Sequence, residues 1–444
     1  MSTAAADSES SLTALDEHVA GDAVAAPVVN YQLRVRTLVS LAAGRGSFRL
    51  AQLAATVILL PLWGQTRYGV YAAAVTTFTW IIPLLQSGPE KTVLKLLPRA
   101  PRTGPPIVEA LTGLLWCLII AMPLTFGITL ALGQRHTAAV YVGVSATAVG
   151  SGSTLLLAGL HRVTGRPWFD ARSAFALSAV QVALIALAAA GLGPLGYVIG
   201  MVAGQTLVNA VLLTHLPRPS LRIRARRGFA RRVGWTIVLM GGPEVCLYMT
   251  TSVLFAIIAA TRWSGEVAQL FAVSIVWTAG LTLLIYTLRV YAPMASLRLL
   301  GRGGVTGRAR ASRLARWALI VDVLWIVAFA VVASHVNLTA VAVSDHAFIL
   351  WAAISGSRTP AIVLTVLAGY LLENSDARST RVTGTVAVAN LLVASAIGAY
   401  AIPRWGGLWI GLSGLGAEMV GAVILIAMVR HGRRIAASLS TSAN

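Results

Sequence analysis

Charged residues are scarce in this chain of 444 residues. Lysine, arginine, aspartate and glutamate together make up 11% of it, whereas 57% of the residues are hydrophobic. A soluble domain carries about a quarter charged residues, because polar surface must cover its core. The composition therefore excludes an ordinary soluble fold and favours a protein that is solvated by lipid.

Motifs of common enzymes and metal sites are also absent. The sequence has no glycine-rich phosphate loop with a lysine, no His-Glu-x-x-His and no Cys-x-x-Cys. Cys117 and Cys246, the two cysteines, lie in apolar runs without metal-ligand spacing. The glycine-rich segment 301–307 lacks the preceding strand of a nucleotide site, so we expect a flexible connector there. We expect no enzyme, no metal and no cofactor.

The net charge of +20 raises the possibility of nucleic-acid binding. The basic residues are not gathered on one face of a soluble module, and no nucleic-acid motif accompanies them. They lie instead in short loops between apolar runs. We therefore expect a membrane protein that does not bind nucleic acid, with residues 1–34 as a disordered cytoplasmic tail.

Long apolar runs take the place of polar surface. About 20 residues at a rise of 1.5 Å cross a hydrocarbon core of about 30 Å as a helix. We predict an all-α polytopic membrane protein with twelve transmembrane helices. The predicted spans are residues 38–62, 70–96, 107–132, 137–159, 173–192, 194–216, 235–260, 267–293, 317–337, 345–372, 382–402 and 406–429.

The basic residues test this division, because cytoplasmic loops are enriched in lysine and arginine. With the N-terminus inside, the outer loops hold only Arg67, Arg135, Arg262 and Arg404. Most of the other basic residues fall on the inner side. The sequence therefore predicts a multi-pass protein of the cytoplasmic membrane, with both termini in the cytoplasm.

The longest basic connector, residues 217–234, lies at the midpoint of the chain. We predict that it links two six-helix lobes at 35–216 and 235–430, and that 431–444 is a cytoplasmic tail. Gly196-Tyr-Val-Ile-Gly200 at the start of the sixth span resembles Gly407-Leu-Trp-Ile-Gly411 at the start of the twelfth. Corresponding spans have the same orientation, which predicts a parallel pseudo-repeat.

Arginines within the predicted spans are the candidate substrate-binding residues. Charges inside a membrane are costly and commonly face a water-filled cavity or a partner. Arg45 and Arg49 share one face of the first span, Arg358 lies in the tenth span, and Arg289 is expected near the outer end of the eighth. A cationic cavity of these residues would hold phosphate or pyrophosphate, whereas snorkelling to headgroups is the alternative, above all for Arg45 and Arg289.

Acidic residues within the spans are fewer. Glu418 lies in the middle of the twelfth span, and Glu244 lies early in the seventh. Each is a candidate for a proton relay or for an ion pair with arginine. The first span has no carboxylate, which argues against a cation-coupled mechanism centred there.

Several short elements are shared with a known family. Gly64-Gln-Thr-Arg-Tyr-Gly-Val-Tyr-Ala-Ala-Ala74 resembles the start of the second helix of bacterial polysaccharide flippases, and Gly193-Pro-Leu-Gly-Tyr197 resembles their turn between helices five and six. The chain thus resembles the multidrug/oligosaccharidyl-lipid/polysaccharide (MOP) exporter superfamily, in its O-antigen-type flippase branch. The resemblance implies a MATE-like fold, in which two lobes surround a cavity that opens to one side at a time.

Three functions follow from these observations. The first is a monomeric flippase that moves a polyprenyl-pyrophosphate-linked glycan across the membrane, with Arg45, Arg49 and Arg358 on the pyrophosphate. The second is a cation-coupled exporter of a small organic molecule or secondary metabolite. The third is a scaffold in a membrane-bound synthase complex that transports nothing itself.

Overall fold

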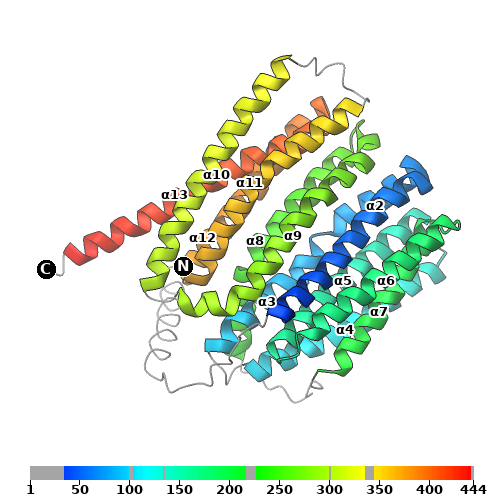
Figure 1. Cartoon of the computed structure of the whole chain (residues 1–444), viewed down its shortest axis with the longest axis horizontal. Helices are drawn as coiled ribbons and strands as arrows, with labels where there is room; N and C mark the ends of the chain where they lie inside the picture. Colours follow the sequence, from blue (N-terminus) through cyan, green and yellow to red (C-terminus); the bar gives the residue numbers. More distant parts are fainter. Residues whose placement is uncertain are drawn as a thin grey trace.

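A computed structural model describes residues 35–99, 104–133, 136–216, 227–299, 302–335, 345–375 and 377–441. Within these residues the chain is helical, and the helices run side by side (Figure 1). The predicted tail 1–34 and the first part of the predicted linker, 217–226, lie outside the described residues.

The described helices make twelve passes through the bundle. Helix α2 contains the first pass and, after Gly64, the beginning of the second pass, which α3 completes. Each later pass is one helix. The helices are α2 (Val35–Phe78), α3 (Ile81–Arg99), α4 (Gly104–Ala131), α5 (His136–Val163), α6 (Trp168–Ala189), α7 (Pro194–Thr214), α8 (Arg227–Ala259), α9 (Val267–Arg298), α10 (Arg302–His335), α11 (Asp345–Ser375), α12 (Ala377–Trp405) and α13 (Leu408–Thr441).

Gly64 divides α2 into the first and second passes. Its φ of 73° and ψ of 164° are non-helical, in a region that glycine enters at little cost. The second pass is broken again between Phe78 and Ile81. Pro83 explains this break, because proline has no N–H to donate to the carbonyl four residues earlier, at Thr79.

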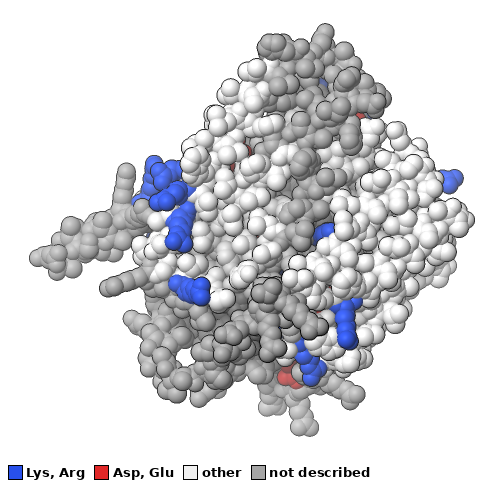
Figure 2. Space-filling view, viewed as in Figure 1, with Lys and Arg blue, Asp and Glu red and all other residues white. Residues whose placement is uncertain are grey.

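Eight apolar stretches of the described residues are long enough to cross a membrane. The first of them, Val39–Leu94, contains two passes. We call the end of the bundle near residues 99, 163, 216 and 299 the basic end, and the end near 64, 132, 190 and 260 the far end. Charged side chains gather mostly toward the basic end, at the left and lower edge of Figure 2, and the surface along the passes is nearly free of them.

The helices pack as two six-pass lobes. In the first lobe α2 packs on α6 and α3 on α5, and in the second lobe α8 packs on α12 and α9 on α11. The same pairs of passes therefore meet in each half, as a parallel repeat requires. Between the lobes α3 packs on α8 and α2 on α9 (Figure 1). The predicted fold class of twelve helices in two lobes is confirmed.

Three helices are longer than the sequence suggested. Helix α10 begins at Arg302, so the expectation of a flexible connector at 301–307 is wrong there. Gly304 and Gly307 bring this helix close to Leu299 and to the backbone of α11. Helix α8 takes in residues 227–234 of the predicted linker, and α13 continues through most of the predicted tail, to Thr441.

Candidate functional site: a cavity between two lobes

A cavity lies between the lobes. This central cavity of about 330 Å³ is lined mainly by α2, α8, α9, α11 and α13, with single residues of α3 and α6, and both lobes contribute to its wall. Its wall combines hydroxyl and amide groups with apolar side chains. The polar group includes Gln52, Thr56, Tyr68, Tyr71, Gln181, Thr251, Ser274, Thr278 and Thr359.

Among the described residues of its wall, only arginine brings formal charge to the central cavity. Arg49 comes from the first lobe and Arg358 from the second, and no aspartate or glutamate is among the described residues of the wall. Two of the four arginines predicted to form a cationic cavity therefore line it. The spacing within each helix could not show that these two residues face each other across the lobes.

Arg49 reaches the cavity without an acidic partner among the described residues. One of its Nη atoms donates a hydrogen bond to Oε1 of Gln52, 2.6 Å away and one helical turn later. Arg49 also lines a small cavity of about 90 Å³ that extends toward Arg45 and Arg289. Its guanidinium keeps N–H donors for an acceptor that carries negative charge.

Arg358 is held by a carboxylate. Its Nη2 lies 2.5 Å from Oε1 of Glu418. The side chain fits because residue 414 is glycine, since a Cβ there would lie 2.1 Å from Arg358 Nη2. Of the two predicted alternatives for Glu418, the geometry shows the ion pair.

A further acid, Asp322, lies close to this pair. It is fully buried in α10, and neither carboxylate oxygen has a hydrogen-bond partner among the described residues. Glu418 and Arg358 are near enough to act on its charge. An ionised carboxylate without partners is costly in such a place, so this group favours a proton or a bound cation.

The basic end of the interface between the lobes holds a network of buried ion pairs. Arg45 Nη2 lies 2.5 Å from Asp170 Oδ1, and Arg162 contacts both Asp170 and Glu90. Asp170 and Glu90 are 0% and 1% exposed. Tyr286 of the second lobe donates a hydrogen bond to Asp170 Oδ2 over 2.9 Å. Arg45 therefore neither snorkels nor lines the central cavity.

Arg289 joins the two lobes in this network. Its Nη1 lies 3.1 Å from Glu90 Oε2, and its Nη2 lies 2.6 Å from Glu244 Oε1. The expectation that it lies near the outer end of its span is wrong. The eighth pass runs from the far end to the basic end, so a residue late in that pass lies at the basic end. Glu244, predicted as a relay or an ion pair, is paired here.

Lys91 completes the network with acids of the second lobe. Its Nζ lies 2.9 Å from Glu373 Oε2 and 3.6 Å from Glu244 Oε2. The sequence carries a signal for this cluster that the search for charges within spans missed. Gly-Pro-Glu occurs at 88–90 and again at 242–244, on the two helices that cross between the lobes.

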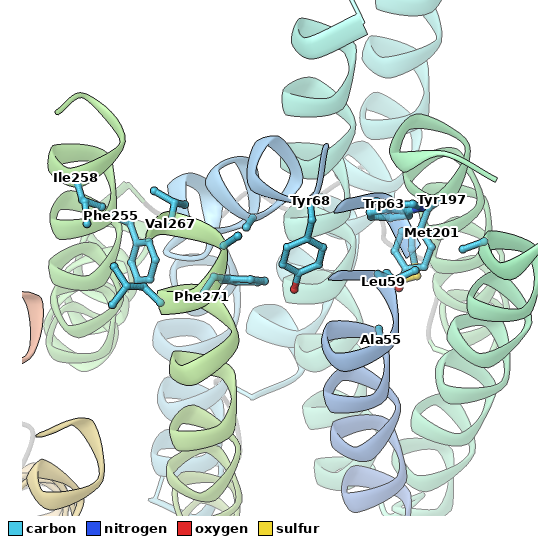
Figure 3. Packing of buried hydrophobic residues seen from close by; sticks show 14 of the residues in the cluster. Ala55, Leu59, Trp63, Tyr68, Tyr197, Met201, Phe255, Ile258, Val267 and Phe271 are labelled. Carbon is cyan, nitrogen blue, oxygen red and sulfur yellow. The ribbon is translucent and has the colours of Figure 1, made fainter. Parts of the chain in front are cut away.

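Aromatic side chains close the far end between the lobes. Tyr68 is fully buried, and its ring centroid lies 6.2 Å from that of Phe271 in the second lobe. Trp63 and Tyr197 pack together behind it at 5.5 Å. Figure 3 shows Tyr68 between this pair and Phe271. With ion pairs at one end and rings at the other, the central cavity lies between two closures.

No group of three or more histidine, cysteine, aspartate or glutamate side chains in the described residues could hold a metal ion. The wall of the central cavity offers positive charge, hydrogen-bonding groups and apolar surface.

Comparison with known proteins identifies the fold. No family model and no curated protein matches the chain. Solved structures match in shape. An outward-facing multidrug resistance MATE family transporter of the MOP superfamily aligns with a TM-score of 0.54 and 12% identity, over 91% of this chain and 96% of that one.

Two further structures align over similar lengths. A MOP superfamily transporter from Pyrococcus furiosus, with a binding pocket of reverse polarity, has a TM-score of 0.52 and 13% identity over 91% of this chain and 95% of its own. A structure named protein A has a TM-score of 0.58 and 15% identity over 90% and 96%. At these identities the likeness shows the MATE fold and leaves the polysaccharide flippase branch a prediction.

Proposed function

We propose that this protein is a membrane transporter that carries a lipid-linked oligosaccharide or polysaccharide precursor between its two lobes by alternating access. The basic end would face the cytoplasm, following the charge of the loops. The observation that carries the proposal is the polarity of the central cavity. Arg49 and Arg358 bring positive charge to its described wall, and no carboxylate lines it.

The parts of such a cargo match the parts of the cavity. A pyrophosphate offers acceptor oxygens for a guanidinium, which binds them through paired N–H groups. Hydroxyls and amides of the wall suit sugar hydroxyls, and Leu59, Leu254 and Phe255 offer apolar contact for the lipid. The Pyrococcus furiosus neighbour, whose pocket polarity is reversed, supports the view that this fold is used with different cavity charges.

The test is a flux assay with the purified full-length protein in liposomes. The probe is a fluorescent polyprenyl pyrophosphate that carries one N-acetylglucosamine, and the matched control is the same lipid without pyrophosphate. We expect transport of the charged lipid alone. The R49A/R358A variant should abolish it while inserting normally, and R49K should retain part of it. Unchanged flux through R49A/R358A would exclude the anion-binding role.

A cation-coupled exporter is the second candidate, and Asp322 is the observation in its favour. This fully buried carboxylate without hydrogen-bond partners lies near Glu418 and Arg358, where a proton or cation could bind. If coupling occurs there, a pH gradient should drive flux of a small organic molecule, and D322N or E418Q should abolish that dependence. Flux that does not depend on the pH gradient would exclude the cation-coupled exporter.

A further inference from the structure

The network of described ion pairs at the basic end is divided unevenly between the lobes. Its four cations are Arg45, Lys91, Arg162 and Arg289, and its four acids are Glu90, Asp170, Glu244 and Glu373. The first lobe contributes Arg45, Lys91, Arg162, Glu90 and Asp170. Among these described pairs, separating the lobes at this end therefore leaves one cation in excess on the first lobe.

The excess cation is Lys91. Arg45 and Arg162 keep Asp170 and Glu90, because all of these side chains belong to the first lobe. The carboxylates that face Lys91 within the described residues, Glu373 and Glu244, both belong to the second lobe. On the second lobe Arg289 keeps Glu244, and Glu373 loses the lysine.

A cavity connects Lys91 to the proposed binding site. Lys91, Glu373 and Glu244 line a side cavity of about 190 Å³, whose wall also includes Arg358 and Glu418. Arg358 in turn lines the central cavity. A negatively charged group that first meets Lys91 therefore has a second cation, Arg358, along the same wall, at the edge of the central cavity.

Resting on the proposed function, we propose that Lys91 is the entry site for the anionic headgroup of the cargo, and that Glu373 and Glu244 displace the headgroup from it when the basic end closes. With the lobes apart, Lys91 binds phosphate oxygens in place of the two carboxylates. On closure the carboxylates return, and the headgroup moves to Arg358 and Arg49. Lys91 thus selects for anionic cargo on the cytoplasmic side.

The experiment compares two variants that both break the lysine–glutamate pairs. In E373Q the lysine keeps its charge and loses a competitor, whereas in K91M the lysine charge is gone. The probe is geranylgeranyl pyrophosphate, with geranylgeraniol as its uncharged control, bound to the purified full-length protein. We expect E373Q to bind the pyrophosphate several-fold more tightly than the native protein, K91M several-fold more weakly and K91R nearly as the native protein.

A labelling readout measures opening separately from binding. Ser87 is fully buried, and its Oγ accepts a hydrogen bond from Arg289 of the other lobe over 2.9 Å. With Cys117 and Cys246 replaced by serine, S87C should react slowly with maleimide, and several-fold faster in both E373Q and K91M. The charge controls are R381Q, an exposed arginine at the basic end, and E266Q at the far end, and neither should change binding or labelling.

Each outcome decides the proposal. If K91M binds the probe as tightly as E373Q does, Lys91 only holds the two lobes together through its ion pairs, and the entry site is excluded. If loss of Arg49 weakens pyrophosphate binding but substitution of Lys91 or Glu373 does not change it, the entry site is excluded and the proposed function is retained. If the native protein and every variant bind geranylgeranyl pyrophosphate and geranylgeraniol equally well, both the entry site and the proposed function are excluded. The K91M/E373Q variant removes both charges of the Lys91–Glu373 pair, so it tests the loss of the lysine charge even if K91M alone does not fold.

Discussion

Buried charges in this protein differ in how fully they are compensated. Asp170 is surrounded by Arg45, Arg162 and the Tyr286 hydroxyl, while Asp322, equally buried, has no hydrogen bond within the described residues. Removing one partner of a buried ion pair leaves the other charge uncompensated, which is costly. The two aspartates should therefore respond in opposite ways to the same substitution.

We expect D170N to lower the stability of the folded protein by about 3–5 kcal/mol, because Arg45 and Arg162 lose the charge that compensates them. D322N should leave stability unchanged or raise it, since the amide cannot ionise in a place where the carboxylate has no hydrogen-bond partner among the described residues. Thermal unfolding of the two purified variants in the same detergent measures this. A loss in D322N as large as that in D170N would contradict the assignment.

Gly414 makes room for the Arg358 guanidinium, so its replacement should disturb the Arg358–Glu418 pair. A methyl group there must displace the guanidinium, at a cost of about 1–3 kcal/mol, as overpacking usually requires. G384A is the matched control, because no atom lies within 4 Å of its added Cβ. We expect G414A to unfold at a lower temperature and to transport less, and G384A to behave as the native protein.

At the scale of helices, the crossing of α3 and α8 determines how closely the lobes approach at the basic end. A Cβ on Gly241 would lie 2.8 Å from the Cα of Gly88, and one on Gly88 would lie 2.4 Å from the carbonyl oxygen of Ile237. Backbone atoms cannot rotate aside as side chains do. The two helices therefore meet only because both residues are glycine, and this contact brings the two Gly-Pro-Glu segments together.

The neighbouring glycine gives a sharp test of this crossing. G241A should push the two helices apart, weaken the ion pairs beside them and increase maleimide labelling of S87C several-fold. G242A should change nothing, because no atom lies within 4 Å of its added Cβ. Equal labelling in G241A and G242A would show that the crossing does not hold the basic end closed.

At the scale of the whole molecule, alternating access requires that the far end can also part. The Tyr68–Phe271 contact joins the lobes there and is apolar in character. An ionic closure on one side and an aromatic one on the other would respond differently to salt and to loss of side-chain volume. The far end should therefore open when the ring of Phe271 is removed.

We expect F271A to increase the reaction of a cysteine at Ser274, in the wall of the central cavity, with an impermeant reagent added at the far end of protein in vesicles. The increase should be several-fold, since a large apolar contact between the lobes is lost. Y400A removes an exposed ring at the same end. The described contacts of the Tyr400 ring, with Arg404 and Trp405, lie on its own helix, so this variant should have no effect. Equal rates would exclude Phe271 as part of the closure.

The sequence by itself determined the class of the protein and the path of its chain through the membrane. Few charges, long apolar runs and basic loops on one side require helices that satisfy their own backbone hydrogen bonds. The predicted spans agree with the helical passes within several residues for most of them. Helix starts at Arg227 and Arg302 were missed, because polar helical turns beyond the membrane carry no hydropathy signal.

Only the tertiary structure decided which charges are available to a ligand. Arg45, Arg49, Arg289 and Arg358 look alike in the sequence, as arginines within apolar helices. Asp170, Glu90, Glu244 and Glu418 approach three of them from other helices, and Arg49 alone keeps no acid beside it within the described residues. The compensation of a buried charge depends on distances of a few ångströms between distant segments, which the order of residues along one helix does not contain.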